Sequence, residues 1–337
     1  MKKALFYEKL NDGRVHCRLC AHNCLINEGR RGICGVRENR QGELYSIVYG
    51  RVIASCLDPI EKKPLFHFYP GSSSYSIATA GCNFKCLHCQ NADISQADVS
   101  LPIGSGSRVS SRDVVDEAAR CKAESISYTY TEPTIFFEFA YETACLANSK
   151  GLKNIFVTNG YMLKEPLKYI KPYLDAANVD LKFFDDNLYR KVCGGSLKPV
   201  LETIRLMKEL GIWLEVTTLI IPGYNDSKEQ LKKIADFLVS VDRNIPWHVS
   251  AFYPAFKMTD TAPTSPETLY MARDVGLVEG LKYVYCGNID SGEEENTYCP
   301  DCGKLLIERR GYNLVSYNIK DSACIYCRNK IDGEGLR

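Results

Sequence analysis

The chain has 337 residues, of which 45% are hydrophobic and 25% are charged, and its formal net charge is +1. This composition is typical of a globular protein with one large domain and small appendages, and it excludes a disordered chain. The near-zero net charge gives no overall attraction to nucleic acid, and no apolar run approaches the roughly 20 residues that cross a bilayer, so neither is an expected partner.

The N-terminal segment contains the first of three cysteine clusters. Residues 1–8 hold only a short apolar stretch, too short for an export signal, so we expect a cytoplasmic protein. Four cysteines then follow at gaps of two, three and nine residues: Cys17, Cys20, Cys24 and Cys34. This quartet predicts a metal site. Zinc and iron–sulfur are both open, a structural role is favoured, and His16 or His22 could replace one thiolate.

The whole chain contains 16 cysteines, and eleven of them fall into the three clusters. A disulfide-stapled secreted scaffold is the alternative explanation for so many cysteines. A chain of this length does not need such staples, and it carries no export signal. The gaps within the clusters are those of metal ligands, so we expect metal rather than disulfides.

The second cluster is a C-x3-C-x2-C motif formed by Cys82, Cys86 and Cys89, directly after a strand predicted over 74–81. Three thiolates at these gaps can hold three irons of a four-iron cluster and leave the fourth iron without a protein ligand. An iron without a protein ligand can bind a reacting molecule. A structural zinc site or a closed four-cysteine cluster is the alternative, although zinc favours pairs at C-x2-C spacing.

Strand and helix signals alternate between residues 74 and 290. Apolar and β-branched runs predict further strands over 125–130, 154–158, 178–183, 213–221, 247–253 and 282–286. Caps, helical periodicity and closing glycines predict helices over 111–124 with Ser111 as cap, 133–151, 197–210, 228–241 and 266–278. Six or seven βα units imply a parallel sheet with fewer strands than a full TIM barrel. We therefore predict an α/β fold with a partial (β/α)6 TIM-like barrel.

Polar residues close several of these strands, where parallel barrels hold the residues that contact ligands. They are Tyr130, Thr131 and Glu132 after the second strand, Asn159 after the third, Asp180 and Lys182 at the fourth, and His248 on the sixth. Asp180 and Lys182 project to the same face, so in a buried position they must pair or meet a ligand. Glu132 could instead only favour the following helix, and His248 could be an ordinary core histidine.

The third cluster lies in the tail, where two C-x2-C pairs are separated by 21 residues: Cys299 with Cys302, and Cys324 with Cys327. Such pairs predict a tetrahedral site of four thiolates for zinc or a single iron, and an auxiliary four-iron cluster is the alternative. We expect three domains: an N-terminal cysteine-rich module (1–70), the barrel (71–291) and a C-terminal metal-binding module (292–337).

The cysteine motif and the strand ends resemble the radical S-adenosylmethionine (SAM) superfamily. The resemblance implies a 4Fe-4S cluster on the three cysteines, whose open iron binds SAM and reductively cleaves it to a 5′-deoxyadenosyl radical. His88 stands where the superfamily usually has an aromatic residue against adenine. Glu132 would bind the amino group of SAM, although Tyr130 and Thr131 replace two glycines there. The remaining implied contacts to SAM or substrate are Asn159, Asp180, Lys182 and His248.

Phrases outside the barrel strands, at 17–24, 58–71 and 285–288, resemble the radical SAM enzyme of the AmmeMemoRadiSam system, a relative of pyruvate formate-lyase activating enzyme. This resemblance implies a reductant such as flavodoxin or ferredoxin, and partners of the Memo and AMMECR1 types. It implies no particular substrate.

We therefore expect a radical SAM enzyme that abstracts hydrogen from a peptide, protein or small molecule. A radical SAM enzyme that modifies RNA is one alternative, against which the near-neutral charge argues. A non-catalytic electron-transfer protein with several clusters is another, and it would leave the polar strand ends without a reason.

Overall fold

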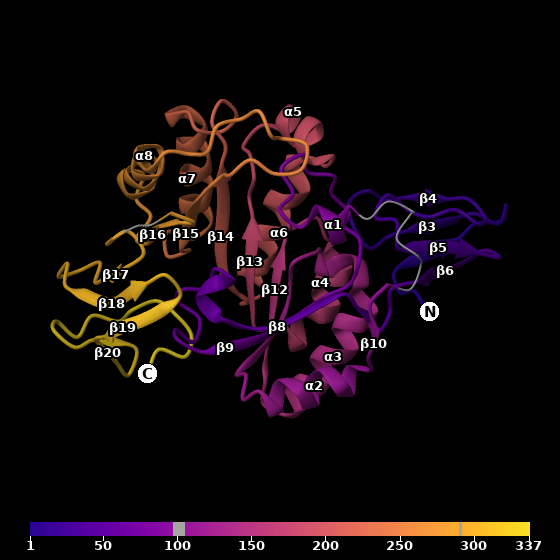
Figure 1. Ribbon diagram of the computed structural model, residues 1–337, viewed down its shortest axis with the longest axis horizontal. Helices are drawn as coiled ribbons and strands as arrows, with labels where there is room; N and C mark the ends of the chain where they lie inside the picture. Colours follow the sequence, from indigo (N-terminus) through magenta and orange to yellow (C-terminus); the bar gives the residue numbers. More distant parts are fainter. Residues whose placement is uncertain (97–104, 290–291) are drawn as a thin grey trace.

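Seven parallel strands form the centre of the structure, a computed structural model that describes residues 1–96, 105–289 and 292–337. They lie side by side in chain order (Figure 1): β9 (Ser73–Ala78), β11 (Ser125–Tyr128), β12 (Lys153–Thr158), β13 (Ala176–Asp180), β14 (Trp213–Ile220), β15 (Trp247–Ala251) and β16 (Val284–Gly287). An eighth strand, β8 (Ala54–Pro59), pairs antiparallel with β9. Among the described residues the edge strands β8 and β16 do not pair, so the sheet stays open and the predicted partial barrel is confirmed.

Helices connect the parallel strands: α2 (Ser111–Arg120), α3 (Phe137–Ser149), α4 (Lys164–Ile170), α6 (Leu197–Glu209), α7 (Lys228–Asp242) and α8 (Pro266–Val278). Each connection joins neighbouring strands, and such crossovers are right-handed, so these helices cover one face of the sheet. Shorter turns lie within the connections: α1 (Ala92–Ser95), α5 (Asp186–Leu188), 3-10 turns at Ile60–Lys62, Pro133–Phe136 and Lys171–Tyr173, and a π-helical turn at Tyr189–Cys193. No helix in the described part of the chain has the length and apolar character that crossing a bilayer requires.

The predicted strands and helices are present, with ends that shift by a few residues. The cap of α2 is Ser110 and not Ser111. Ser110 Oγ accepts from the amide of Asp113, whose carboxylate accepts from the Ser110 amide in return. This capping box selects the first serine because its partner must lie three residues later. The helix then ends at Arg120, four residues before the predicted end.

Among the elements that were not predicted, two lie in or beside the central sheet. The short helix α4 contains Pro166, which is tolerated because it lies in the first turn, where no intrahelical hydrogen bond is lost. Strand β8 belongs to the segment 1–70, yet it pairs along its whole length with β9 of the central sheet. The domain boundaries at 70 and 291 stay a prediction, and the first module is joined to the sheet through this strand.

The N-terminal segment forms two small antiparallel sheets beside the helical face, at one end of the long axis in Figure 1. One contains β1 (Lys2–Lys3), β6 (Glu43–Ser46) and β5 (Arg37–Arg40); the other contains β2 (Tyr7–Lys9), β3 (Val15–Cys17) and β4 (Leu25–Ile26). A buried ion pair attaches the segment to α3. Arg37 Nη1 and Nη2 donate to the two carboxylate oxygens of Glu138 at 3.0 Å each, and both side chains are 2% exposed.

The C-terminal segment lies at the opposite end of that axis (Figure 1). It contains β17 (Thr297–Tyr298), β18 (Leu305–Arg310) and β19 (Asn313–Tyr317) in one sheet, and β20 (Ile319–Lys320) with β21 (Ala323–Cys324). A further antiparallel pair of short strands is formed by β7 (Arg51–Val52) and β10 (Ser107–Arg108), and β10 directly precedes α2 in the chain. Buried Arg309 joins the tail to the segment that precedes β9, because its guanidinium donates to the carbonyl of Phe66 at 2.9 Å. Within the tail it also donates to the carbonyl of Glu295 at 2.9 Å and to Thr297 Oγ1 at 2.8 Å.

We predict that Arg37→Ala lowers the free energy of unfolding by about 3–5 kcal/mol, because it leaves the Glu138 carboxylate buried without its cation. Urea denaturation followed by circular dichroism measures the change. Arg14→Ala, which removes an exposed ion pair with Asp12, is the matched control and should not change stability measurably. Equal effects of the two substitutions would contradict the structural role of the buried pair.

Candidate active site and metal centres

A cavity of about 550 Å³ lies at the carboxyl ends of the parallel strands. Its walls contain residues from the ends of six strands and from the cysteine loop after β9. Every predicted residue of the central site lines it: Cys82, Cys86, His88, Cys89, Tyr130, Thr131, Glu132, Asn159, Asp180, Lys182 and His248. Residues that lie up to 166 positions apart in the sequence therefore meet in one place, because parallel strands bring their carboxyl ends to one edge.

The cysteine loop is fixed against the turn Tyr189–Cys193 by two backbone hydrogen bonds. The amide of Lys85 donates to the carbonyl of Cys193 at 2.7 Å, and the amide of Leu87 donates to the carbonyl of Val192 at 2.9 Å. Phe84 packs so closely on Gly195 that a Cβ there would lie 2.3 Å from the ring. The fold thus requires glycine at this contact, and the contact positions the loop that carries the three cysteines.

His88 is buried, and neither of its ring nitrogens has a hydrogen-bond partner among the described residues. Burial, with a smaller effect of Lys182, lowers the pKa of His88 to about 3, so the ring is neutral at physiological pH. A buried polar ring without a partner costs free energy unless a ligand contacts it. Its place in the cavity wall fits the predicted contact with a bound molecule.

Glu132 joins the ends of β11 and β12. Its Oε1 accepts from the amide and hydroxyl of Thr134 and from the hydroxyl of Thr158, and its Oε2 accepts from the amide of Asn159 at 2.8 Å. The bond to the Thr134 amide is the helix-capping role that the sequence left open. Among the described residues Oε2 has one donor, the amide of Asn159, so it can accept a second hydrogen bond from a ligand in the cavity.

Tyr130 has a backbone conformation that favours glycine, with φ of +59°. Its carbonyl accepts from Asn91 Nδ2 at 2.9 Å, and its hydroxyl donates to Asp58. Thr131 Oγ1 donates to the carbonyl of Thr79 at 2.8 Å. Both residues are therefore held by the protein itself, with a strained backbone at the cavity wall.

Asp180 and Lys182 pair with each other, as their shared face of the strand predicts. The Lys182 ammonium donates to Asp180 Oδ2 at 2.9 Å. Burial opposes the ammonium charge, but the Asp180 carboxylate and the Cys86 thiol outweigh it and raise the pKa of Lys182. Asn159 Nδ2 donates to Asn83 Oδ1 at 2.7 Å and lies 3.9 Å from Cys82 Sγ. These groups form a polar wall beside the cysteines.

His248 belongs to a buried network below the cavity. Its Nε2 lies 2.7 Å from Glu215 Oε2, and Glu215 also accepts from the backbone amides of Phe66 and His67. One ring nitrogen of His248 therefore already has a hydrogen-bond partner, as expected if His248 is an ordinary core histidine. His248 still lines the cavity, and its contact with a ligand stays a prediction.

Several residues of the wall were not predicted. Lys62 and Lys63 donate to Asp58, and together with Tyr130 these hydrogen bonds lower the pKa of Asp58 against the opposing effect of burial. The phrase 58–71 was singled out only by resemblance, and nothing local in it indicates that it reaches the site. Tyr312 of the tail also lines the cavity.

Cys193 is a further unpredicted neighbour of the site. A hydrogen bond with the Cys193 thiol lowers the pKa of Cys86 against the effect of burial, and Lys182 lowers it further. Cys193 lies in the π-helical turn, 107 positions after Cys86, so no spacing rule could connect the two.

The C-terminal quartet has the geometry of a site for one metal ion. The four sulfurs of Cys299, Cys302, Cys324 and Cys327 all lie within 4.8 Å of one another. Two of the separations are 3.6 and 3.8 Å. Thiolates that surround one zinc at about 2.3 Å lie about 3.8 Å apart, so the site fits a single tetrahedral ion.

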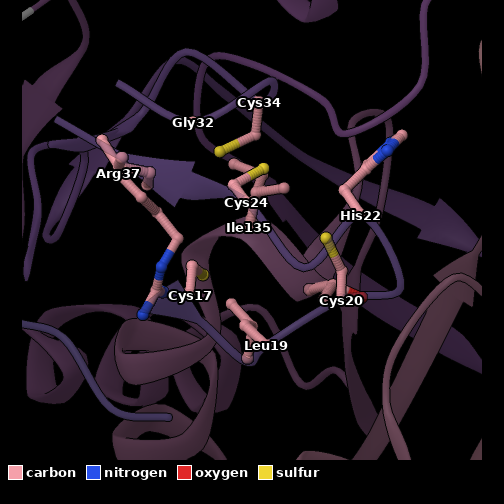
Figure 2. Close-up of a pocket in the computed structure, with 11 residues that line it drawn as sticks. Cys17, Leu19, Cys20, His22, Cys24, Gly32, Cys34, Arg37 and Ile135 are labelled. Carbon is pink, nitrogen blue, oxygen red and sulfur yellow. The ribbon is translucent and has the colours of Figure 1, made fainter. Parts of the chain in front are cut away.

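The N-terminal quartet surrounds a second, small cavity (Figure 2), which apolar side chains such as Leu19, Ile26 and Ile135 also line. Figure 2 shows the four sulfurs around one central space and the ring of His22 turned away from it. His22 Nε2 instead donates to the carbonyl of Asn83 at 2.7 Å. The possible replacement of a thiolate by His22 is therefore not favoured.

Comparison with known proteins agrees with this architecture. A sequence model of the Radical SAM superfamily matches residues 76–238. An uncharacterized protein from Methanocaldococcus jannaschii is 49% identical over 336 residues, which cover 98% of this chain and 99% of that protein. This chain belongs to the radical SAM superfamily.

Two further proteins are similar to this chain. A pyruvate formate-lyase-activating enzyme from Clostridium pasteurianum is 21% identical over 49% of this chain and 68% of its own length, so the chain is a relative of these enzymes. In fold it is similar to a radical SAM methyltransferase from Sphaerobacter thermophilus, with a TM-score of 0.51 and 15% identity over 71% of each chain. The latter similarity concerns the fold alone.

Membership of the superfamily implies an enzyme that uses a 4Fe-4S cluster and SAM. The residues at the strand ends fit these cofactors. Three thiols share the wall of one cavity, Glu132 Oε2 has free acceptor capacity there, and the buried nitrogens of His88 have no partner among the described residues. Thiolates are the usual protein ligands of such clusters.

We predict that Cys302→Ala releases one metal ion per chain and exposes the tail to proteolysis after residue 290. One structural zinc can contribute on the order of 10 kcal/mol to folding, and the buried core of the tail contains only seven hydrophobic residues. Elemental analysis and limited proteolysis of the full chain measure the two effects. Cys121→Ala, at the end of α2 and outside the clusters, is the control. Loss of several irons together with sulfide would instead indicate an auxiliary cluster in the tail.

Proposed function

We propose that this protein reductively cleaves SAM at a 4Fe-4S cluster held by Cys82, Cys86 and Cys89, and abstracts hydrogen from a substrate in the cavity. The observation that carries the proposal is the meeting of these three thiols with the polar strand ends around one space of about 550 Å³. When bound, the cluster and SAM would supply the electron and the 5′-deoxyadenosyl radical; the protein would supply position and enclosure.

Each wall residue has a distinct proposed task. Glu132 Oε2 accepts a hydrogen bond from the amino group of SAM, and its other oxygen keeps the ends of β11 and β12 together. The neutral ring of His88 packs on the adenine. Asp180 and Lys182 remain a charged pair that can bind the polar groups of SAM or substrate, with Asn159 and His248 beside them.

The substrate class follows from the relatives only as a proposal. Activating enzymes act on other proteins, so a peptide or protein substrate is the first candidate, and a small molecule is the second. We propose flavodoxin or ferredoxin as the electron donor and Memo-type and AMMECR1-type proteins as partners within the AmmeMemoRadiSam system. Co-purification of the full chain with each of these proteins under anaerobic conditions tests the partners.

We predict that changing Cys82, Cys86 and Cys89 together to Ala abolishes SAM cleavage, because the iron that binds SAM is lost. Anaerobic incubation with SAM and dithionite, followed by chromatography of 5′-deoxyadenosine, measures this activity. The electron paramagnetic resonance signal that shifts on addition of SAM should disappear as well. A shift that persists in the triple variant would move the active cluster to another cysteine set and refute the assignment.

We predict that Glu132→Gln weakens SAM binding by about 1.5–3 kcal/mol, the worth of one charge-assisted hydrogen bond. Equilibrium titration of the reconstituted protein with SAM measures the affinity, and the iron content should not change. Glu229→Gln on the exposed side of α7 is the matched control. Unchanged affinity would mean that Glu132 serves only as the cap that the structure also contains.

A further inference from the structure

The N-terminal quartet differs from the C-terminal quartet in the space that its cysteines enclose. All four sulfurs of the tail lie within 4.8 Å of one another. The four N-terminal cysteines instead line a cavity, and their sulfurs face one shared space (Figure 2). Four thiols around a cavity require a metal group that fills it.

A four-iron cluster meets this requirement. Each of its irons binds one thiolate and the irons stand at separate corners, so the four thiolates lie farther apart than around a single ion. The walls of the cavity are apolar apart from Arg37 and a few polar groups. Buried Arg37, whose charge is paired with Glu138, also lines this cavity.

The quartet also shares a wall with the proposed active site. Glu132 lines the large cavity, while Thr134 and Ile135 of the same segment line the quartet cavity. On the other side, His22 Nε2 donates to the carbonyl of Asn83, the residue after Cys82.

Gly81, the residue before Cys82, packs closely on the loop that carries Cys34. A Cβ on Gly81 would lie 3.0 Å from the carbonyl oxygen of Cys34 and 2.7 Å from Val36. The loop that carries Cys82 is therefore in direct contact with the loop that carries Cys34. A purely structural metal site does not require such proximity to a second set of thiols.

We propose that Cys17, Cys20, Cys24 and Cys34 hold an auxiliary four-iron cluster that relays single electrons to the cluster at Cys82, Cys86 and Cys89. An external one-electron donor, a reduced flavodoxin or ferredoxin, gives one electron to the auxiliary cluster and is itself oxidised. The auxiliary cluster then returns to its oxidised state as the second cluster is reduced. The relay rests on the proposed function, whereas the presence of the auxiliary cluster does not.

The presence of the cluster is tested in the full chain with Cys82, Cys86 and Cys89 changed to Ala. After anaerobic reconstitution, this variant should contain about four acid-labile sulfides per chain, which neither zinc nor a single iron brings. Adding Cys20→Ala and Cys24→Ala together should remove the sulfide, because only two thiolates of the quartet remain, and adding Cys302→Ala instead should leave it. Zinc without sulfide in the triple variant, or sulfide that disappears only with Cys302→Ala, would overturn the proposal.

The relay is tested in chains that keep the three active-site cysteines. The double variant Cys20→Ala/Cys24→Ala should keep the resonance signal that shifts with SAM, which shows that the barrel is folded, and should lose a second signal that does not shift. Rapid-freeze measurements should show loss of the fast reduction of the SAM-responsive cluster by reduced flavodoxin, with Cys121→Ala as control. An unchanged rate in the double variant would overturn the relay while leaving the proposed SAM chemistry intact.

Discussion

The hydrogen bonds of Glu132 hold together the part of the molecule on which the site depends. One carboxylate fixes the start of the segment that leads into α3 and the end of β12, through donors that come from Thr134, Thr158 and Asn159. Burial raises the pKa of Glu132, and the hydrogen bonds from these residues oppose that rise. A buried carboxylate is costly unless it is surrounded by donors, and here the donors come from the end of β12 and from the 3-10 turn that follows Glu132. The same segment separates the large cavity from the N-terminal cysteines.

Two buried arginines attach the terminal segments to other parts of the chain in a similar way. Arg37 pairs with Glu138 of α3, and Arg309 donates to backbone carbonyls and to Thr297. The N-terminal residues share one continuous apolar core with the barrel, whereas the tail has a small core of its own. Charge and hydrogen bonds therefore hold the tail in place more than apolar burial does. A bound metal would accordingly contribute more to the stability of the tail than to that of the N-terminal segment.

The three cysteine clusters differ in the space between their sulfurs more than in the number of sulfurs. The tail brings four sulfurs close enough for one ion. The central three line a large cavity together with polar strand ends, and the N-terminal four surround a small apolar one. Thiolate ligands are chemically alike, so the protein selects the metal group through the distances that the backbone imposes.

The sequence by itself determined the parallel βα alternation, the partial barrel and the three cysteine clusters, because these depend on local periodicity and short spacings. It also indicated that polar strand ends such as Asp180 and Lys182 would meet. The sequence did not identify Ser110 rather than Ser111 as the cap of α2, which the capping box decides. It also did not predict α4, a short helix whose few residues include a proline.

Only the tertiary structure decided the contacts that join distant segments. Cys193 lies against Cys86, Gly81 against Cys34, and Arg309 donates to Phe66 across 243 positions. The sequence likewise left open which quartet suits one ion, since gaps of two to nine residues constrain the backbone but not the separation of sulfurs from different loops. That separation is fixed by how β3, β4 and the loop at Cys34 pack on the barrel, and such packing is a property of the whole fold.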